Sequence, residues 1–116
     1  MANERILVVD DEKLIRMSLV EELTRQGFRV FEAETGGAGL QRAAQGDIDL
    51  ILLDYRLPDM DGLSVLGELA QKFPDTLVIL MTAYSSIDNA VQAIKLGAYD
   101  YLNKPFDMDE MTIRIR

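Results

Sequence analysis

The chain has 116 residues, with 12 Lys and Arg against 20 Asp and Glu, a formal charge of −8, no histidine and no cysteine. This length is typical of one domain, and the missing residue types exclude disulfides, thiolate metal sites and imidazole catalysis. The acidic balance argues against binding of nucleic acid or anionic lipid. The apolar runs are too short for a membrane span and a signal peptide is lacking, so we expect a cytoplasmic domain.

Short apolar runs predict five strands, at 6–9, 28–32, 50–53, 77–81 and 99–102. The first, third and fourth runs are almost uniformly apolar. This pattern is typical of central strands in a parallel sheet that is covered on both faces.

Helical patterns alternate with these strands, at 12–26, 36–45, 62–72 and 87–94, and a last helix starts at Asp107. The alternation predicts a single α/β domain, 1–116. The last helix reaches Arg116 without a stop signal. We therefore expect it to be truncated and the domain to be part of a longer chain.

Polar residues follow four of the predicted strands at the point where each ends: Asp10 with Asp11, Asp54, Thr82 and Lys104. Ligands of open parallel sheets bind outside the carboxyl ends of the strands, where neighbouring strands would bring these residues together. Clustered carboxylates raise one another's pKa unless a cation binds, and oxygen ligands suit Mg²⁺. A lysine, a hydroxyl and Mg²⁺ around one aspartate predict phosphoryl transfer onto that carboxylate.

Each of these residues also has a simpler structural interpretation. Asp10 or Asp11 could be the N-cap of the helix that follows, and Asp54 could be a turn residue. Thr82 could cap a turn, and Lys104 could be a solvated surface residue. Two adjacent acids exceed what one cap needs, and the coincidence of four polar strand ends favours a common site.

Four segments resemble the receiver domain of two-component response regulators. They are Ile-Leu-Val-Val-Asp-Asp-Glu at 6–12, Leu-Leu-Asp-Tyr-Arg-Leu-Pro-Asp-Met-Asp-Gly at 52–62, Met-Thr-Ala at 81–83 and Lys-Pro-Phe at 104–106. The resemblance covers essentially the whole chain. It implies a flavodoxin-like (CheY-like) doubly wound fold with five parallel strands in the order 2-1-3-4-5 and helices on both faces.

The run at 81–102 is similar to receivers of the NtrC type, which precede an AAA+ σ54-activating module and a helix-turn-helix domain. This similarity implies that the chain is the N-terminal part of a transcriptional regulator. DNA binding and ATPase activity would then belong to the output domains and not to this domain.

The resemblance implies a Mg²⁺ site with a role for each ligand. Asp11 and Asp54 would bind the ion directly, together with the backbone carbonyl of Arg56. Asp10 would contact the ion through water.

The resemblance also implies the phosphoryl chemistry and the switch. Asp54 would accept a phosphoryl group from a phosphohistidine of a sensor histidine kinase, and Lys104 and Thr82 would contact that group. Tyr101 would turn inward as Thr82 moves, although a tyrosine in a strand is more often a packing residue. The output surface, and the surface of a homodimer, would be the fourth helix, the fifth strand and the last helix.

Other functions remain open at this point. A Mg²⁺-dependent phosphatase with an aspartyl nucleophile usually has a second acid two residues later, where this chain has Arg56. A pure interaction module with a vestigial site would not need the complete set of polar residues. A flavodoxin-like cofactor binder would need a phosphate-binding loop, and the glycines at 36–39 lack that spacing.

Overall fold

The structure is a computed structural model that describes residues 4–82 and 87–103 of the chain. Its elements alternate between strand and helix: β1 (Arg5–Val9), α1 (Lys13–Arg25), β2 (Arg29–Ala33), α2 (Gly36–Ala44), β3 (Leu50–Asp54), α3 (Gly62–Lys72), β4 (Leu77–Thr82), α4 (Ile87–Leu96) and β5 (Asp100–Asn103). The strands form one parallel sheet in the order β2-β1-β3-β4-β5. The predicted fold class and strand order are confirmed.

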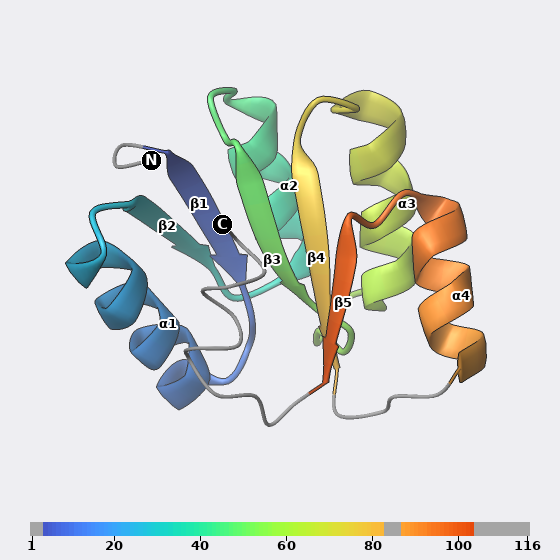
Figure 1. Cartoon of the computed structure of the whole chain (residues 1–116), viewed down its shortest axis with the longest axis horizontal. Coiled ribbons are helices and arrows are strands. Elements are labelled where there is room, and N and C mark those ends of the chain that lie inside the picture. Colours follow the sequence, from blue (N-terminus) through green and yellow to red (C-terminus); the bar gives the residue numbers. More distant parts are fainter. Residues whose placement is uncertain (1–3, 83–86, 104–116) are drawn as a thin grey trace.

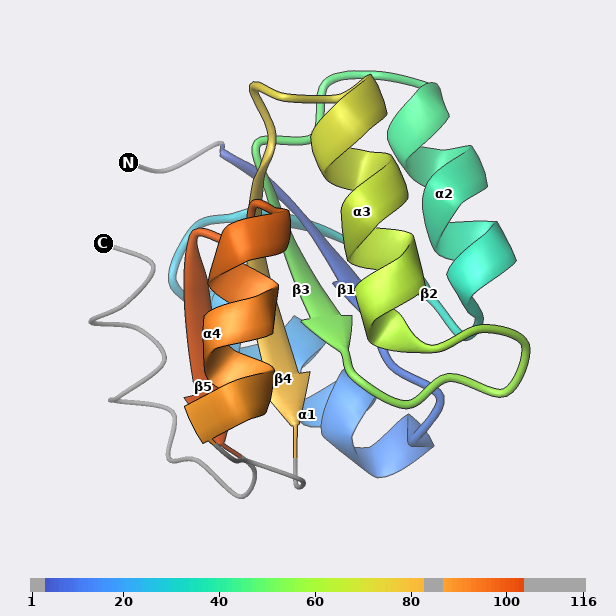
Figure 2. The same ribbon diagram turned by 90° about the vertical axis from the view of Figure 1, so that its right-hand side faces the viewer.

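Helices cover both faces of the sheet. Helix α1 packs on one face, and α2, α3 and α4 lie side by side on the other (Figures 1 and 2). Successive side chains of a strand point to opposite faces, so Ile6 and Val8 join the core under α1, whereas Leu7 and Val9 join the core under the other helices. All four are buried, which explains why this strand is uniformly apolar.

The predicted element boundaries hold to within one or two residues. Asp54 and Thr82 were expected just after their strands, and they are the last residues of β3 and β4. Gly27 and Gly97, which follow the ends of α1 and α4, have φ values of 101° and 114°, which only glycine adopts readily. The predicted last helix from Asp107 lies outside the described residues. No helix in the described part of the chain has the length and apolar character of a membrane span.

The N-terminus of α2 is capped from two directions. Thr35, the N-cap, accepts a hydrogen bond through Oγ1 from the Ala38 N–H at 3.0 Å. Asp59, in the loop between β3 and α3, accepts from Gly36 through Oδ1 at 2.8 Å and from Gly37 through Oδ2 at 2.9 Å. These bonds satisfy N–H groups that the helix leaves free and fasten the loop after β3 to α2.

Helix α3 begins directly against the end of β3. A Cβ atom at Gly62 would lie 2.6 Å from the carbonyl oxygen of Asp54 and 2.7 Å from the Cα of Tyr55. The Gly62 N–H donates to the carbonyl of Tyr55 at 2.6 Å. Only glycine fits this contact between two backbones, and it fixes the chain on both sides of the loop after Asp54.

The Asp59 cap predicts a specific pH dependence of stability. Hydrogen bonds from Gly37 and then Gly36 lower the pKa of Asp59. Since the folded pKa lies below the unfolded one, the ionised carboxylate stabilises the fold above about pH 4, and this stabilisation is lost as the pH falls through the lowered pKa. Asp59→Asn should therefore lower the unfolding free energy at neutral pH, and the difference from the native protein should shrink in acid.

Urea unfolding at a series of pH values measures this difference. Asp75→Asn, which removes an exposed carboxylate elsewhere, is the matched control and should show no such trend. A difference between Asp59→Asn and the native protein that stays constant into acid would contradict the ionic cap.

The two glycines of α3 should respond oppositely to alanine. Gly62→Ala forces a methyl group into backbone atoms and should destabilise the fold by about 1–3 kcal/mol, as overpacking does. Gly67 has no atom within 4 Å of an added Cβ, so Gly67→Ala should stabilise the fold by about 0.5–1 kcal/mol through helix propensity. Denaturant unfolding measures both, and equal effects would refute the proposed backbone contact.

Candidate functional site

Three polar side chains are buried at the carboxyl edge of the sheet. Asp10 directly follows β1, Asp54 ends β3 and Thr82 ends β4, with exposed fractions of 0%, 5% and 1%. Strand β3 lies between β1 and β4, so Asp54 is the central member of the three. The sheet therefore brings together residues that are 44 and 28 positions apart in the chain.

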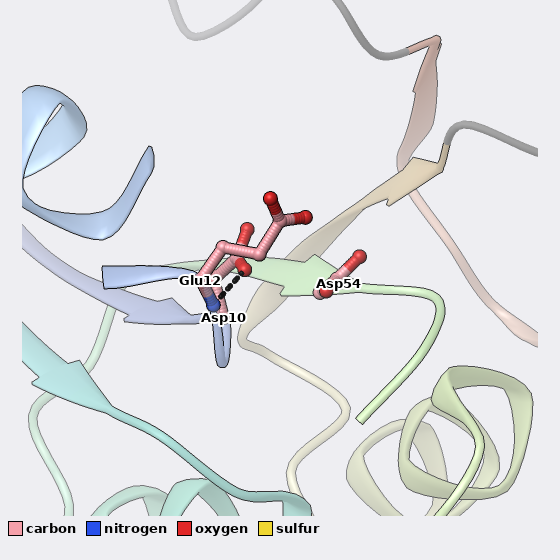
Figure 3. Close-up of side chains that lie close together, drawn as sticks. All are labelled: Asp10, Glu12 and Asp54. Carbon is pink, nitrogen blue, oxygen red and sulfur yellow. Dashed lines mark hydrogen bonds between the residues drawn. The ribbon is translucent and has the colours of Figure 1, made fainter. Parts of the chain in front are cut away.

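Carboxylates from two strand ends converge on one point. One carboxylate oxygen each from Asp10, Glu12 and Asp54 lies within 4.8 Å of the others. Figure 3 shows Asp10 and Glu12 rising from the turn after β1 beside Asp54. A buried carboxylate is costly unless a cation or hydrogen bonds compensate it, and an all-oxygen donor set suits Mg²⁺. The donor chemistry thus fits the Mg²⁺ that the resemblance implies.

Glu12 is a member of this cluster that the sequence reasoning missed, whereas Asp11 is exposed and lies outside the cluster. The cause is the local turn: Oδ1 of Asp10 accepts a hydrogen bond from the Glu12 N–H at 2.9 Å (Figure 3). Such an aspartate turn is a common local motif, and the acid at position 12 was its only sequence signal.

Of the other predicted site residues, the structure describes Arg56 and Tyr101. Arg56 is exposed in the loop after β3, where it forms an isolated bridge with Asp61. Tyr101 lies on β5 opposite Leu80, is partly buried against the core under α3 and α4, and has a buried hydroxyl group. Lys104 lies outside the described residues.

Thr82 and Tyr101 share one face of the sheet. Thr82 is two residues beyond Leu80 on β4, so their side chains point to the same side. Leu80 belongs to the core against which Tyr101 packs. The two predicted switch residues are therefore on neighbouring strands and on the face that α4 covers.

Known proteins with the same sequence pattern are numerous. Residues 6–116 match the family model of the response regulator receiver domain. The chain is 42% identical to the regulatory protein AtoC of Escherichia coli, over 99% of this chain and 25% of that protein. It is 39% identical to the sporulation initiation phosphotransferase F of Bacillus subtilis, over 96% of this chain and 90% of that protein.

Solved structures of receiver domains have the same fold. A receiver domain from Methanospirillum hungatei has a TM-score of 0.94 at 33% identity, covering 98% of this chain and 91% of that one. TrrA of Thermotoga maritima, solved in complex with Mg(2+)-BeF, has a TM-score of 0.87 at 39% identity, covering 97% and 96%.

The relatives also include the DNA-binding transcriptional regulator NtrC of Escherichia coli, 44% identical over 90% of this chain and 22% of that protein. The chain thus spans about a quarter of the length of AtoC and NtrC. The family model covers nearly the whole chain, and the solved structures share its fold. The chain belongs to the response regulator receiver domain family.

Proposed function

We propose that this domain is a phosphoacceptor switch in which Asp54 takes a phosphoryl group from a phosphohistidine of a sensor histidine kinase. The observation that carries the proposal is the burial of Asp54 at the centre of an acidic edge, beside Asp10 and Thr82. A carboxylate oxygen of Asp54 would form the bond to phosphorus as the phosphorus–nitrogen bond of the donor breaks. The hydroxyl of Thr82 and the ammonium of Lys104 would then hold the phosphoryl oxygens.

Mg²⁺ would be held at the same edge. Asp11, Asp54 and the backbone carbonyl of Arg56 are the proposed direct ligands, and Asp10 would contact the ion through water. Glu12 would add the charge of a further carboxylate beside the site. When bound, the ion would neutralise charge on the transferring phosphoryl group. The short side chain of Asp11 starts from an exposed position in the same turn, and an aspartate loses fewer rotamers than a glutamate on binding.

The proposed switch runs from Asp54 to the far edge of the sheet. Phosphorylation adds about −1.5 to −2 charge and three acceptor oxygens, which attract Thr82. Thr82 lies on the same face as Tyr101 and on the neighbouring strand, so a movement of Thr82 would change the space available to the tyrosine ring. The domain would exist in an equilibrium between two conformations of Thr82 and Tyr101. Phosphorylation would shift this equilibrium toward the conformation that contacts the phosphoryl group.

The output surface would be α4, β5 and the last helix. Val91 and Ile94 on α4, and Tyr99 just before β5, are large apolar residues that are exposed here. Exposed apolar side chains that gather into a contiguous patch are typical of a surface that binds another protein. These residues support docking of an output domain or a second receiver on this surface. By analogy with NtrC, the output would be an AAA+ module with a helix-turn-helix domain. The whole protein would then be a cytoplasmic transcriptional regulator. DNA binding would belong to the output domain and not to this acidic domain.

The acceptor assignment predicts the outcome of a labelling experiment. With acetyl phosphate and Mg²⁺, the native domain should gain one phosphoryl group, and Asp54→Asn should gain none because its amide is not a nucleophile. Intact mass spectrometry measures the gain, and Asp75→Asn should label like the native protein. Full labelling of Asp54→Asn would show that another residue is the acceptor, and sustained release of phosphate from a small phosphate ester would favour a phosphatase.

The metal assignment predicts different roles for two adjacent acids. Asp11→Asn should raise the dissociation constant for Mg²⁺ by about tenfold or more, because a direct ligand is lost. Glu12→Gln should raise it by less than about threefold, as expected for a carboxylate that adds only charge to the site. Isothermal titration with Mg²⁺ measures both, and the reverse order would give the direct contact to Glu12.

A further inference from the structure

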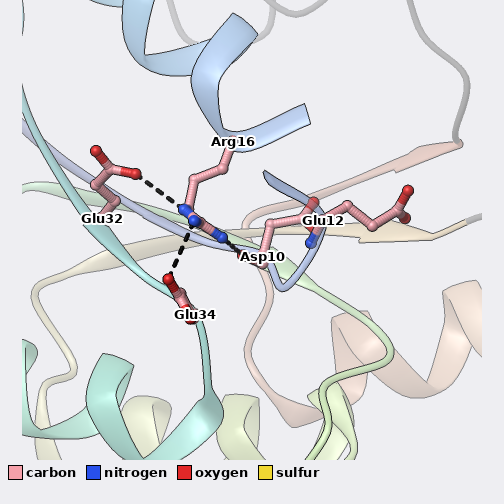
Figure 4. A network of polar contacts seen from close by, with 5 residues as sticks. All are labelled: Asp10, Glu12, Arg16, Glu32 and Glu34. Carbon is pink, nitrogen blue, oxygen red and sulfur yellow. Dashed lines mark hydrogen bonds and ion pairs between the residues drawn. The ribbon is translucent and has the colours of Figure 1, made fainter. Parts of the chain in front are cut away.

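Arg16 is a buried arginine behind the acidic edge that the proposed phosphoryl chemistry does not use. It lies near the start of α1, its side chain is 8% exposed, and its guanidinium contacts three acceptors (Figure 4). Nε donates to Glu32 at 2.9 Å, Nη2 donates to Glu34 at 3.3 Å, and Nη1 donates to the backbone carbonyl of Asp10 at 2.8 Å. One side chain thereby connects α1, the end of β2 and the turn after β1.

The hydrogen bond from Arg16 is one of three that hold Asp10 in place. The Asp10 N–H donates to the carbonyl of Ala33 at 3.1 Å, and its carbonyl accepts from Arg16. Its side chain caps the Glu12 N–H. The backbone of Asp10 is therefore held on both sides, and the bond from the Glu12 N–H orients its carboxylate.

The two glutamates serve as anchors for the guanidinium. A buried arginine is costly unless it is paired and hydrogen-bonded, and Glu32 and Glu34 supply that pairing. Glu32 is 49% exposed and Glu34 is 74% exposed, so solvent screens the second pair more strongly. Glu32, which is closer and less exposed, is the stronger anchor.

We propose that Arg16 is a positioning residue for the Mg²⁺ site, because its planar fork holds the Asp10 turn so that Asp10 and Glu12 face Asp54. The inference rests on the proposed function, since it assumes that these acids surround the ion. It assigns the residue a role through geometry and not through charge. A positive charge alone at this place would repel Mg²⁺.

Arg16→Lys separates geometry from charge. Lysine keeps the positive charge, but its single ammonium cannot replace a rigid fork that reaches three acceptors in different directions. We expect the dissociation constant for Mg²⁺ to rise about threefold to tenfold, toward the range seen when groups that orient metal ligands are removed. Arg29→Lys, at an exposed position on β2, is the matched control and should leave the constant within twofold of the native value.

Titration calorimetry with Mg²⁺ gives the dissociation constants, and thermal unfolding without Mg²⁺ gives the stability of each variant. A merely structural role would lower the melting temperature of Arg16→Lys and leave its Mg²⁺ affinity unchanged, and that result overturns the inference. An equal loss of affinity in Arg29→Lys overturns it as well. Absence of Mg²⁺ binding or labelling in the native protein would instead defeat the proposed function itself.

If Arg16→Lys does not fold, the anchors provide the test. Glu32→Gln leaves the arginine in place but weakens its main anchor, and it should raise the dissociation constant for Mg²⁺ by about twofold to threefold. Glu34→Gln removes the longer and more exposed pair and should have a smaller effect. Equal affinities in the native protein and both variants would overturn the inference.

Discussion

The repulsion between buried carboxylates at the carboxyl edge of the sheet is the constraint on which the rest of this domain depends. Asp10 and Asp54 are almost fully buried, and Glu12 brings a third carboxylate within 4.8 Å of both. Like charges at this distance repel one another, and positive charge placed among them relieves the repulsion. The cluster is therefore suited to a ligand that brings positive charge.

Precise backbone placement keeps these acids together despite their repulsion. The parallel ladder aligns the ends of β1 and β3, and tethers outside the ladder hold the loops that leave them. Arg16 holds the turn after β1, Asp59 holds the tip of the loop after β3, and Gly62 holds its base. Each tether uses backbone groups on at least one side, so substitutions that preserve the acids can still disturb the site.

Much of this architecture could be predicted from sequence because it depends on local patterns. Uniformly apolar runs identify buried parallel strands, and the sheet order places Asp10, Asp54 and Thr82 at one edge. Glu12 could not be predicted, because its place depends on a turn geometry that many sequences adopt. The contacts of Arg16 with Glu32 and of Asp59 with Gly36 could not be predicted either. Their partners are 16 and 23 residues apart in the chain, and no periodic pattern indicates contacts at such separations.

The backbone contact at Gly62 fixes the end of β3 against α3. Because the N-terminus of α3 rests on backbone atoms of Asp54 and Tyr55 without an intervening side chain, this contact restrains the end of β3 relative to that helix. Together with the Asp59 cap, it ties the chain after β3 to both α2 and α3. In the proposed switch Asp54 would then be a fixed point, and the side chains that adjust to a phosphoryl group would be those of Thr82 on β4 and Tyr101 on β5.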